Sequence, residues 1–356
     1  MFQSTMKYPT RRPLAQLLCL LTLSLFIAAQ RANATTESFD LLGVNAAILF
    51  DSDNGAILFE QNADERIPPA SLTKILSMFL AFDHIRAGRA TLDSEVVVSG
   101  EAARAGGSRM GLKKGRRVRL RELLLGMAVS SGNDASVAVA EFVGGSVPAF
   151  VNMMNAKAKK LGMADSYFCN PNGLPDPAQR TTARDMLTLA RAYLRAHPEA
   201  MRYHNTPALN FRGQVTWNKN PLLGQYAGVD GLKSGWIRDS GYNLIFTASR
   251  ANKRLLAVTL GAPSARARGA EACRLLDAGF LVRNNKAVSV AAALHKMPSP
   301  VFRLDLQKNA QEAGRLYAQA QTRIQPQHGA RAKARKQAVH APKNGKQAAR
   351  KKKTKK

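Results

Sequence analysis

The stretch Pro68-Pro69-Ala70-Ser71-Leu72-Thr73-Lys74 places a serine three residues before a lysine, directly after two prolines. The apolar spacing that follows predicts a mostly buried helix over residues 71–84. Residues three apart share one face of a helix, so the Ser71 hydroxyl and the Lys74 amine are expected to be neighbours. The positive helix N-terminus would stabilise a developing oxyanion and, together with partial burial, would favour the neutral form of Lys74. This spacing is therefore consistent with a nucleophile and its base, although S-x-x-K alone occurs by chance in many proteins.

A second motif, Ser131-Gly132-Asn133, stands where another helix is expected to begin. Serine and asparagine are common N-cap residues because their side chains accept hydrogen bonds from the free N–H groups of the first turn. In a catalytic interpretation, the Ser131 hydroxyl would instead relay a proton and the Asn133 amide would hold the backbone of a substrate. The motif by itself favours the ordinary cap.

A third motif, Lys233-Ser234-Gly235, lies in a run over residues 229–236 that is expected to be a strand. There the lysine and the hydroxyl would receive a substrate carboxylate, and the glycine would let a peptide pair along the strand edge. Each motif alone is weak. Together and in this order they match the S-x-x-K, S-D-N and K-T-G signature of penicillin-binding proteins and class A β-lactamases.

The chain resembles the low-molecular-weight penicillin-binding proteins, which are serine D-alanyl-D-alanine carboxypeptidases. The resemblance covers roughly residues 40–282 and extends beyond the three motifs, to residues 46–51, 68–74, 129–135, 170–175 and 228–233. It implies an α+β fold of the penicillin-binding and β-lactamase type, with a mainly antiparallel sheet covered by helices and a separate helical cluster. It also implies a hydrolase of peptidoglycan stem peptides that acts in cell-wall maturation and cell shape, is inhibited covalently by β-lactams, and needs no metal or organic cofactor.

The resemblance assigns catalytic roles to three side chains. Ser71 would attack the carbonyl between the two terminal D-alanines, D-alanine would leave, and water would hydrolyse the acyl-enzyme. Lys74 would be the base and Ser131 the proton relay. The backbone N–H groups of Ser71 and Trp236 would form the oxyanion hole.

The resemblance also assigns substrate binding, with two departures from the family pattern. Asn133 would hold the substrate backbone, and Lys233 with Ser234 would bind its carboxylate. The family usually has threonine where Ser234 stands, and serine keeps the hydroxyl. Many members have a second threonine where this chain has Ile237, which affects the expected substrate preference. Lys219 stands where a family arginine near the carboxylate is expected.

The sequence supports four alternative functions to different degrees. A β-lactamase is disfavoured because no segment offers a clear glutamate-containing loop, and Gly132 stands where those enzymes usually have aspartate. A DD-endopeptidase of the same family stays open, as does a non-catalytic wall-binding protein with a degenerate enzyme core. A metallo-carboxypeptidase is disfavoured because the six histidines form no metal-ligand spacing.

The charge and hydropathy pattern divides the chain into three parts. Residues 1–34 resemble a signal peptide, since basic residues precede an apolar run over residues 14–29 and Ala32-Asn33-Ala34 offers a cleavage site. Export to the periplasm or the outer face of the cytoplasmic membrane is therefore expected. Residues 35–283 form the predicted peptidase domain.

Residues 284–356 form a basic C-terminal tail, with 18 Lys+Arg against 2 Asp+Glu out of a net charge of +29 for the 356 residues. From residue 323 onward there are 13 basic and no acidic residues, a composition typical of a disordered segment. The tail is expected to contact an anionic membrane surface or wall polymer. Export makes nucleic acid an unsuitable partner.

The remaining expectations concern single elements. A β-hairpin is expected over residues 45–61, and an irregular loop over residues 170–176. Cys169 and Cys273 are expected to be free thiols, with a disulfide between them left open. Further helices are expected over residues 122–129, 132–144, 182–196 and 264–282, further strands over residues 229–236, 242–249 and 255–261, and a short alternating segment over residues 116–120.

Overall fold

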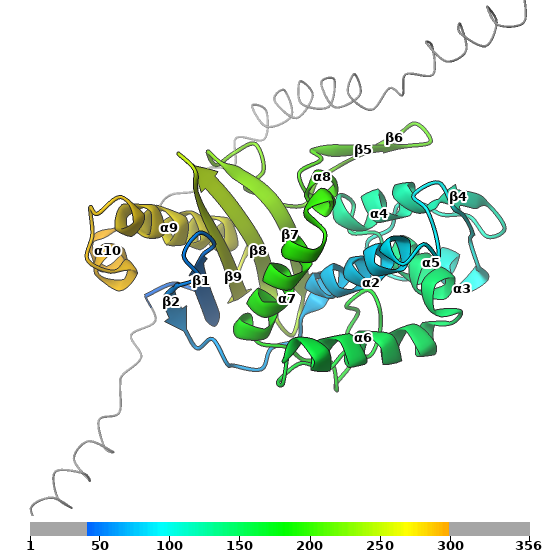
Figure 1. Ribbon diagram of the computed structural model, residues 1–356, viewed down its shortest axis with the longest axis horizontal. Helices are drawn as coiled ribbons and strands as arrows, with labels where there is room; N and C mark the ends of the chain where they lie inside the picture. The colour runs from blue at the N-terminus through cyan, green and yellow to red at the C-terminus, as the bar shows by residue number, and fades with distance from the viewer. Residues whose placement is uncertain (1–40, 299–356) are drawn as a thin grey trace, which may run out of the picture. The chain divides into compact units, whose positions relative to one another are not determined.

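A five-stranded sheet with the strand order β2-β1-β9-β8-β7 lies at the centre of the computed structural model, which describes residues 41–298 (Figure 1). Every neighbouring pair of strands is antiparallel, as predicted. The strands are β1 (Ala46–Asp51), β2 (Ile57–Gln61), β7 (Val229–Ile237), β8 (Gly241–Arg250) and β9 (Lys253–Ala262). The predicted hairpin and the three later strands are thus confirmed, while the signal peptide and residues 299–356 of the tail lie outside the described residues.

Both faces of this sheet are buried. In β1, Ala46, Ile48 and Phe50 belong to one hydrophobic core, and Ala47 and Leu49 belong to a second core on the opposite face. Side chains alternate across a strand, so a strand that is covered on both faces needs an unbroken apolar run. The sequence of β1 supplies that run, and all six of its residues are buried.

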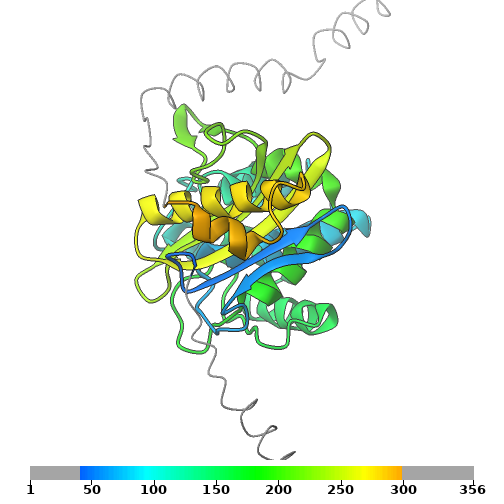
Figure 2. The ribbon, with the colours of Figure 1, turned by 90° about the vertical axis from the view of Figure 1, so that its left-hand side faces the viewer.

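Helices from different parts of the chain cover the two faces of the sheet. The helices α9 (Ala265–Arg283) and α10 (Val290–Lys296) lie on one face (Figure 2). The other face packs against α7 (Ala183–Ala196), beyond which lies the helical cluster (Figure 1). This cluster consists of α2 (Lys74–Arg86), α4 (Leu120–Ala128), α5 (Asn133–Gly144) and α6 (Val147–Leu161). The arrangement is the predicted α+β architecture.

Short elements complete the described part of the chain. The pairs β3–β4 and β5–β6 are small antiparallel ribbons apart from the main sheet. The bounds are the 3₁₀ turn η1 (Ala70–Thr73), β3 (Glu95–Val97), α3 (Gly100–Arg104), β4 (Arg117–Arg119), η2 (Pro198–Ala200), α8 (Met201–His204), β5 (Ala208–Phe211) and β6 (Gln214–Trp217).

Two boundaries differ from the predictions. The helix expected over residues 71–84 is divided, because residues 70–73 form the 3₁₀ turn and the α-helix begins at Lys74. Residues 284–298, which were expected to belong to the tail, include the folded helix α10. The α10 residues Val290, Ala293 and Leu294 are buried in the same core as α9, which explains why this segment is folded.

The described residues also show whether any helix could span a membrane and whether the two cysteines are paired. No single helix within residues 41–298 is long and apolar enough to cross a bilayer, and only the bent pair α5–α6, with 84° between its helices, meets that length and composition together. Cys273 is buried, Cys169 is half-buried, and both are free thiols. Burial raises the pKa of Cys169 to about 11 and that of Cys273 to about 12, so neither is a reactive thiolate near neutral pH.

Candidate active site

The Ser71 hydroxyl and the Lys74 amine are in direct contact. Lys74 Nζ lies 2.9 Å from Ser71 Oγ, and the lysine side chain is fully buried. In a 3₁₀ turn the side chains at i and i+3 eclipse each other, so the tight turn over residues 70–73 brings the two groups closer than an α-helix would. The neighbourhood predicted from the spacing is therefore confirmed, with different local geometry.

The Lys74 amine has three neighbours, and their chemistry matches a neutral amine. Besides Ser71 Oγ, Nζ lies 2.7 Å from Asn133 Oδ1 and 2.5 Å from the Asn172 carbonyl oxygen. Both of these oxygens can only accept hydrogen bonds. An uncharged amine has two N–H groups for them and a lone pair left over for the Ser71 O–H. In the neutral form of Lys74 this lone pair faces the Ser71 hydroxyl.

The charges around Lys74 favour this neutral form. Burial lowers the pKa of Lys74 well below its usual value, and the positive charges of Lys233 and Lys219 lower it further. Only the carboxylate of Asp134 acts in the opposite direction. Desolvation and neighbouring cations are the two effects that convert a buried lysine into a general base.

Ser131 lies in the loop that leads into α5, with its side chain buried and its backbone in the left-handed region at φ 58°. A non-glycine residue in that region is strained, and such strain is concentrated at functional sites. The alternative interpretation of this motif as an ordinary N-cap does not hold, because Gly132 occupies the cap position and no side chain caps α5. Among residues 41–298 the Ser131 hydroxyl has no hydrogen-bond partner, so it is available to a substrate.

The Asn133 amide is fixed by contacts on both of its ends. Its Oδ1 accepts from Lys74, and its Nδ2 donates to the Gly106 carbonyl at 2.7 Å. Its backbone N–H donates to the Ser108 carbonyl at 2.7 Å. These contacts leave the second N–H of Nδ2 for the substrate backbone, which is the role expected for Asn133.

The third motif lies on the free edge of the sheet. β7 is the outermost strand, and a Cβ added to Gly235 would lie 3.0 Å from the backbone nitrogen of Ser71. Only glycine lets the strand approach the nucleophile turn so closely. Trp236, the next residue, is 56% exposed, and its ring lies 5.8 Å from that of Tyr242. The oxyanion-hole assignment of the Ser71 and Trp236 N–H groups stays a prediction.

Lys233 and Ser234 are buried beside this edge. Lys233 Nζ donates to the Ser234 carbonyl at 2.7 Å, and Ser234 Oγ donates to the Lys219 carbonyl at 2.9 Å. Burial lowers the pKa of Lys233 to about 7, with further contributions from the charges of Lys219 and Arg268. Within the described residues no carboxylate forms a salt bridge with these three cations. The site can therefore take up an anion.

Two site residues were not predicted. Arg268 of α9 is buried, its Nε has no hydrogen-bond partner within the described residues, and its guanidinium lies 5.5 Å from the Tyr242 ring. Asn172 contributes only its carbonyl. The loop that carries it packs on the nucleophile turn, because Gly173 has φ +82° and a Cβ there would lie 1.8 Å from the Ala70 carbonyl oxygen. Lys219, expected near the carboxylate, donates to Ser108 Oγ at 2.6 Å.

Hydrogen bonds join Ser71, Lys74 and Asn133, and the third motif lies against the nucleophile turn at Gly235, so the structure brings the three predicted motifs together. The seven predicted residues are Ser71, Lys74, Ser131, Asn133, Lys233, Ser234 and Trp236, and they come from the 3₁₀ turn, the loop before α5 and the edge strand β7. No group of three His, Cys, Asp or Glu side chains that could hold a metal ion occurs within residues 41–298.

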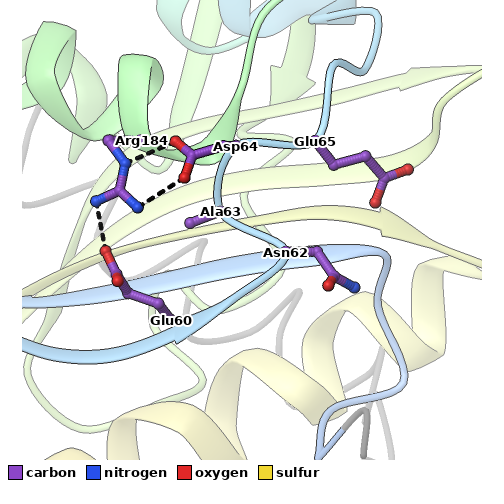
Figure 3. Close-up of a pocket in the computed structure, with 6 residues that line it drawn as sticks. All are labelled: Glu60, Asn62, Ala63, Asp64, Glu65 and Arg184. Atoms are coloured by element: carbon purple, nitrogen blue, oxygen red, sulfur yellow. Dashed lines mark hydrogen bonds and ion pairs between the residues drawn. The ribbon is translucent and has the colours of Figure 1, made fainter. Parts of the chain in front are cut away.

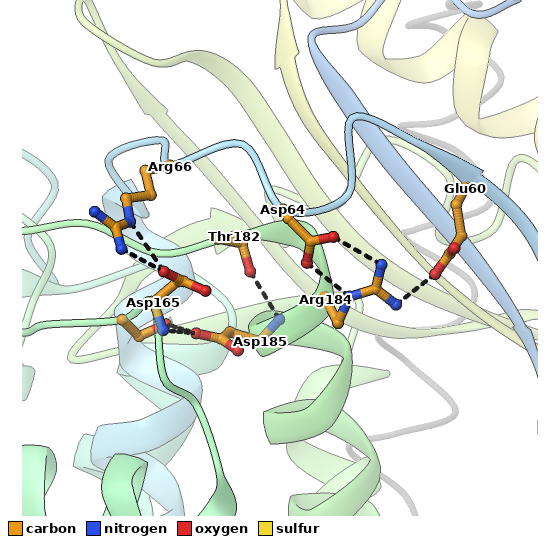
Figure 4. A network of polar contacts seen from close by, with 8 residues as sticks. Glu60, Asp64, Arg66, Asp165, Thr182, Arg184 and Asp185 are labelled. Carbon is orange, nitrogen blue, oxygen red and sulfur yellow. Dashed lines mark hydrogen bonds and ion pairs between the residues drawn. The ribbon is translucent and has the colours of Figure 1, made fainter. Parts of the chain in front are cut away.

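A polar network fixes the segment that leads from β2 to the nucleophile turn (Figure 4). Arg184 of α7 pairs with Asp64 at 2.7 Å and also with Glu60, while Arg66 pairs with Asp165 at 2.6 Å. The pocket over this network is lined by acidic side chains, but Glu60 and Asp64 are both engaged by Arg184 (Figure 3). We attribute a structural role to this region, which holds the approach to Ser71 against α7.

Comparison with known proteins places this site in context. The family model described as D-alanyl-D-alanine carboxypeptidase matches residues 33–264. The chain is 37% identical over 240 residues to D-alanyl-D-alanine carboxypeptidase DacF of Bacillus subtilis, covering 66% of this chain and 61% of the relative. It is 38% identical over 265 residues to D-alanyl-D-alanine carboxypeptidase DacC of Escherichia coli, covering 72% of this chain and 66% of the relative. The match spans less than two thirds of either relative.

Solved structures show the same fold. Penicillin-binding protein 6B from Escherichia coli superposes with a TM-score of 0.65 at 37% identity, covering 67% of this chain and 77% of that one. Penicillin-binding protein D2 from Listeria monocytogenes in its ampicillin-bound form superposes with a TM-score of 0.62 at 31% identity, covering 67% and 98%. The predicted fold type is therefore confirmed.

Proposed function

This chain belongs to the D-alanyl-D-alanine carboxypeptidase family, and we propose that it removes the terminal D-alanine from peptidoglycan stem pentapeptides through an acyl-enzyme on Ser71. The observation that carries the proposal is the 2.9 Å contact between Ser71 Oγ and a buried Lys74 amine whose two other neighbours only accept hydrogen bonds. Burial beside the Ser71 hydroxyl lowers the pKa of Lys74, which supports a working site over a degenerate, non-catalytic core.

The site suits each step of acyl transfer. Ser71 Oγ attacks the carbonyl carbon between the two D-alanines, and its proton passes to Lys74. The C–N bond then breaks, and the leaving D-alanine takes that proton on its nitrogen, with the Ser131 hydroxyl as the relay. Water hydrolyses the ester and frees Ser71. Throughout, the substrate backbone lies along the free edge of β7, held by Asn133 on its other side.

The cations of the site account for the specificity for a chain end. Lys233, Lys219 and Arg268 concentrate positive charge beside β7 and have no carboxylate partner there. The terminal carboxylate of a peptide supplies the missing negative charge. An internal peptide bond offers no such group, so the substrate is expected to be cut at its C-terminal residue.

Release of D-alanine from a synthetic stem pentapeptide tests the proposal. We expect turnover of the free acid, and a loss of about 30-fold or more in kcat/KM when the C-terminus is amidated, because the cations then stay unpaired. A cross-linked dimer serves as the second substrate. Faster cleavage of the dimer than of the pentapeptide would assign the endopeptidase instead, and absence of turnover on both would overturn the proposal.

We also propose that the protein is exported and that its basic tail binds an anionic membrane surface or wall polymer. The support is in the sequence: the signal-like residues 1–34 and the 13 basic residues from 323 onward. Each basic residue near an anionic surface contributes about 1 kcal/mol, an effect that salt screens. A chain without residues 323–356 should therefore leave the membrane and wall fractions at lower salt than the full chain. Equal salt dependence of the two chains would contradict the tethering, and recovery of both in the cytosol would contradict export.

A further inference from the structure

A second pocket, of about 420 Å³, is lined mainly by residues 107–114, in the loop that also borders the active site. Three cations from this loop line it, and no acidic side chain does. Its lining residues are Ala103, Gly107, Arg109, Gly111, Leu112, Lys113, Lys114 and Gln214. This region is called the cationic pocket below.

The cations of this pocket lack the partners that neighbouring cations have. On and beside the adjoining β3–β4 ribbon, Arg117 pairs with Glu95, and both Arg119 of β4 and Arg121 of α4 pair with Asp93. Arg109, Lys113 and Lys114, in contrast, form no salt bridge with any residue that the structure describes. Three uncompensated positive charges in one concave site attract an anion.

The buried carboxylate of Asp134 fixes the backbone of this loop. The buried Asp134 carboxylate accepts the backbone N–H groups of Met110 at 2.9 Å, Gly111 at 2.9 Å and Leu112 at 3.0 Å. Hydrogen bonds to a buried carboxylate are among the strong ones. The backbone between Arg109 and Lys113 is therefore fixed, and a ligand that binds there does not have to order the loop.

The same loop forms one wall of the active site. Its Gly106 carbonyl accepts from the Asn133 amide, and its Ser108 hydroxyl accepts from Lys219. A Cβ added to Gly107, which lines the cationic pocket, would lie 2.8 Å from Asn133 Nδ2. The backbone at Gly107 thus lies between this pocket and Asn133, the residue expected to hold the substrate backbone. Gln214 of β6 also lines the pocket.

We propose that the cationic pocket is a subsite for a carboxylate in the part of the peptide that precedes the scissile bond. This inference rests on the proposed function and names the substrate as an acidic peptide. The position of the pocket favours this ligand over a polymer or a membrane, because the charges lie in a concavity that adjoins Asn133. Lys233 and its neighbours serve the C-terminal carboxylate, so the two anionic groups of one peptide would occupy separate sites.

A pair of matched peptides tests the subsite. Both end in D-Ala-D-Ala, and they differ only in one upstream side chain, a carboxylate in one and its carboxamide in the other. For the wild type we expect kcat/KM to be about tenfold higher for the carboxylate, through KM, since three exposed ion pairs together have about that effect. The triple variant Arg109→Gln, Lys113→Gln, Lys114→Gln should lower this preference to about one.

A control variant removes the same amount of charge elsewhere. Lys159, Lys160 and Arg195 are exposed residues of α6 and α7 outside both sites, and their replacement by glutamine should leave the tenfold preference intact. A wild type without preference, or a triple variant that keeps it, overturns the subsite. Equilibrium binding of the two peptides to the Ser71→Ala chain gives the same ratio without turnover, so that failure of the subsite is distinguished from failure of the proposed reaction.

Discussion

The Ser71→Ala chain is expected to form no covalent adduct with a labelled penicillin and to release D-alanine about 10⁴-fold or more slowly than the wild type. Ser71 Oγ is the group that the buried Lys74 amine contacts at 2.9 Å. Removing the hydroxyl removes the atom that forms the acyl bond, and no neighbouring group can replace it. Side-chain removal at this half-exposed position costs little packing, so the variant should fold.

Intact-mass measurement after penicillin treatment checks this prediction. The wild type should gain the mass of one inhibitor, and Ser71→Ala should gain none. Ser52→Ala, a change of the same kind at an exposed turn of the β1–β2 hairpin, should label like the wild type. An adduct of unchanged mass on the Ser71→Ala chain would place the nucleophile at another residue.

The sheet and most helices could be predicted because their local patterns agree with their tertiary surroundings. Strands β8 and β9 carry apolar side chains on both faces, as a doubly covered sheet requires, and α7 shows a clear apolar stripe. No prediction covered α6, although Phe150, Met154 and Ala158 recur every four residues and are its buried side chains. The glycines at 144 and 145 indicated the end of one helix, and a new helix begins two residues later behind a Ser146 cap.

In the candidate site, residues that belong to short sequence motifs could be predicted, whereas residues brought there by long-range packing could not. Ser71, Lys74, Asn133 and Lys233 belong to three short motifs, and the occurrence of the three in this order indicated chemistry. Arg268 belongs to no motif, and only the packing of α9 against the sheet brings its charge near Lys233. Asn172 acts through a backbone carbonyl, for which any residue would serve, so side-chain patterns could not find it.

Lys74→Met should lower the rate of acylation by penicillin or by a stem pentapeptide by about 10²- to 10⁴-fold, the usual contribution of a general base. Methionine keeps the length of the side chain but offers no lone pair of comparable basicity to the Ser71 proton. The Asn133 and Asn172 oxygens lose a donor, so some loss of stability is also expected. Lys157→Met provides the matched control, because Lys157 is another poorly exposed lysine, paired with Asp83 at 2.8 Å away from the site. The Lys157→Met control should lose stability but keep its acylation rate. If Lys74→Met acylates at a rate within threefold of the wild type, the Lys74 amine is not the base.

The pH profile separates a base from a merely structural lysine. Acylation needs neutral Lys74, whose pKa is lowered, so kcat/KM of the wild type should rise with pH as this amine loses its proton. Binding of the substrate carboxylate needs protonated Lys233, whose pKa is about 7, so kcat/KM should fall above about that pH. The charge of Lys219 lowers both pKa values. Lys219→Gln should therefore raise both and move the whole bell-shaped profile to higher pH, even if the loss of a carboxylate contact lowers its height. If the profile loses height without moving, Lys219 binds substrate but does not affect the pKa of Lys74. The lowered pKa of Lys74 would then be due to burial and to the charge of Lys233.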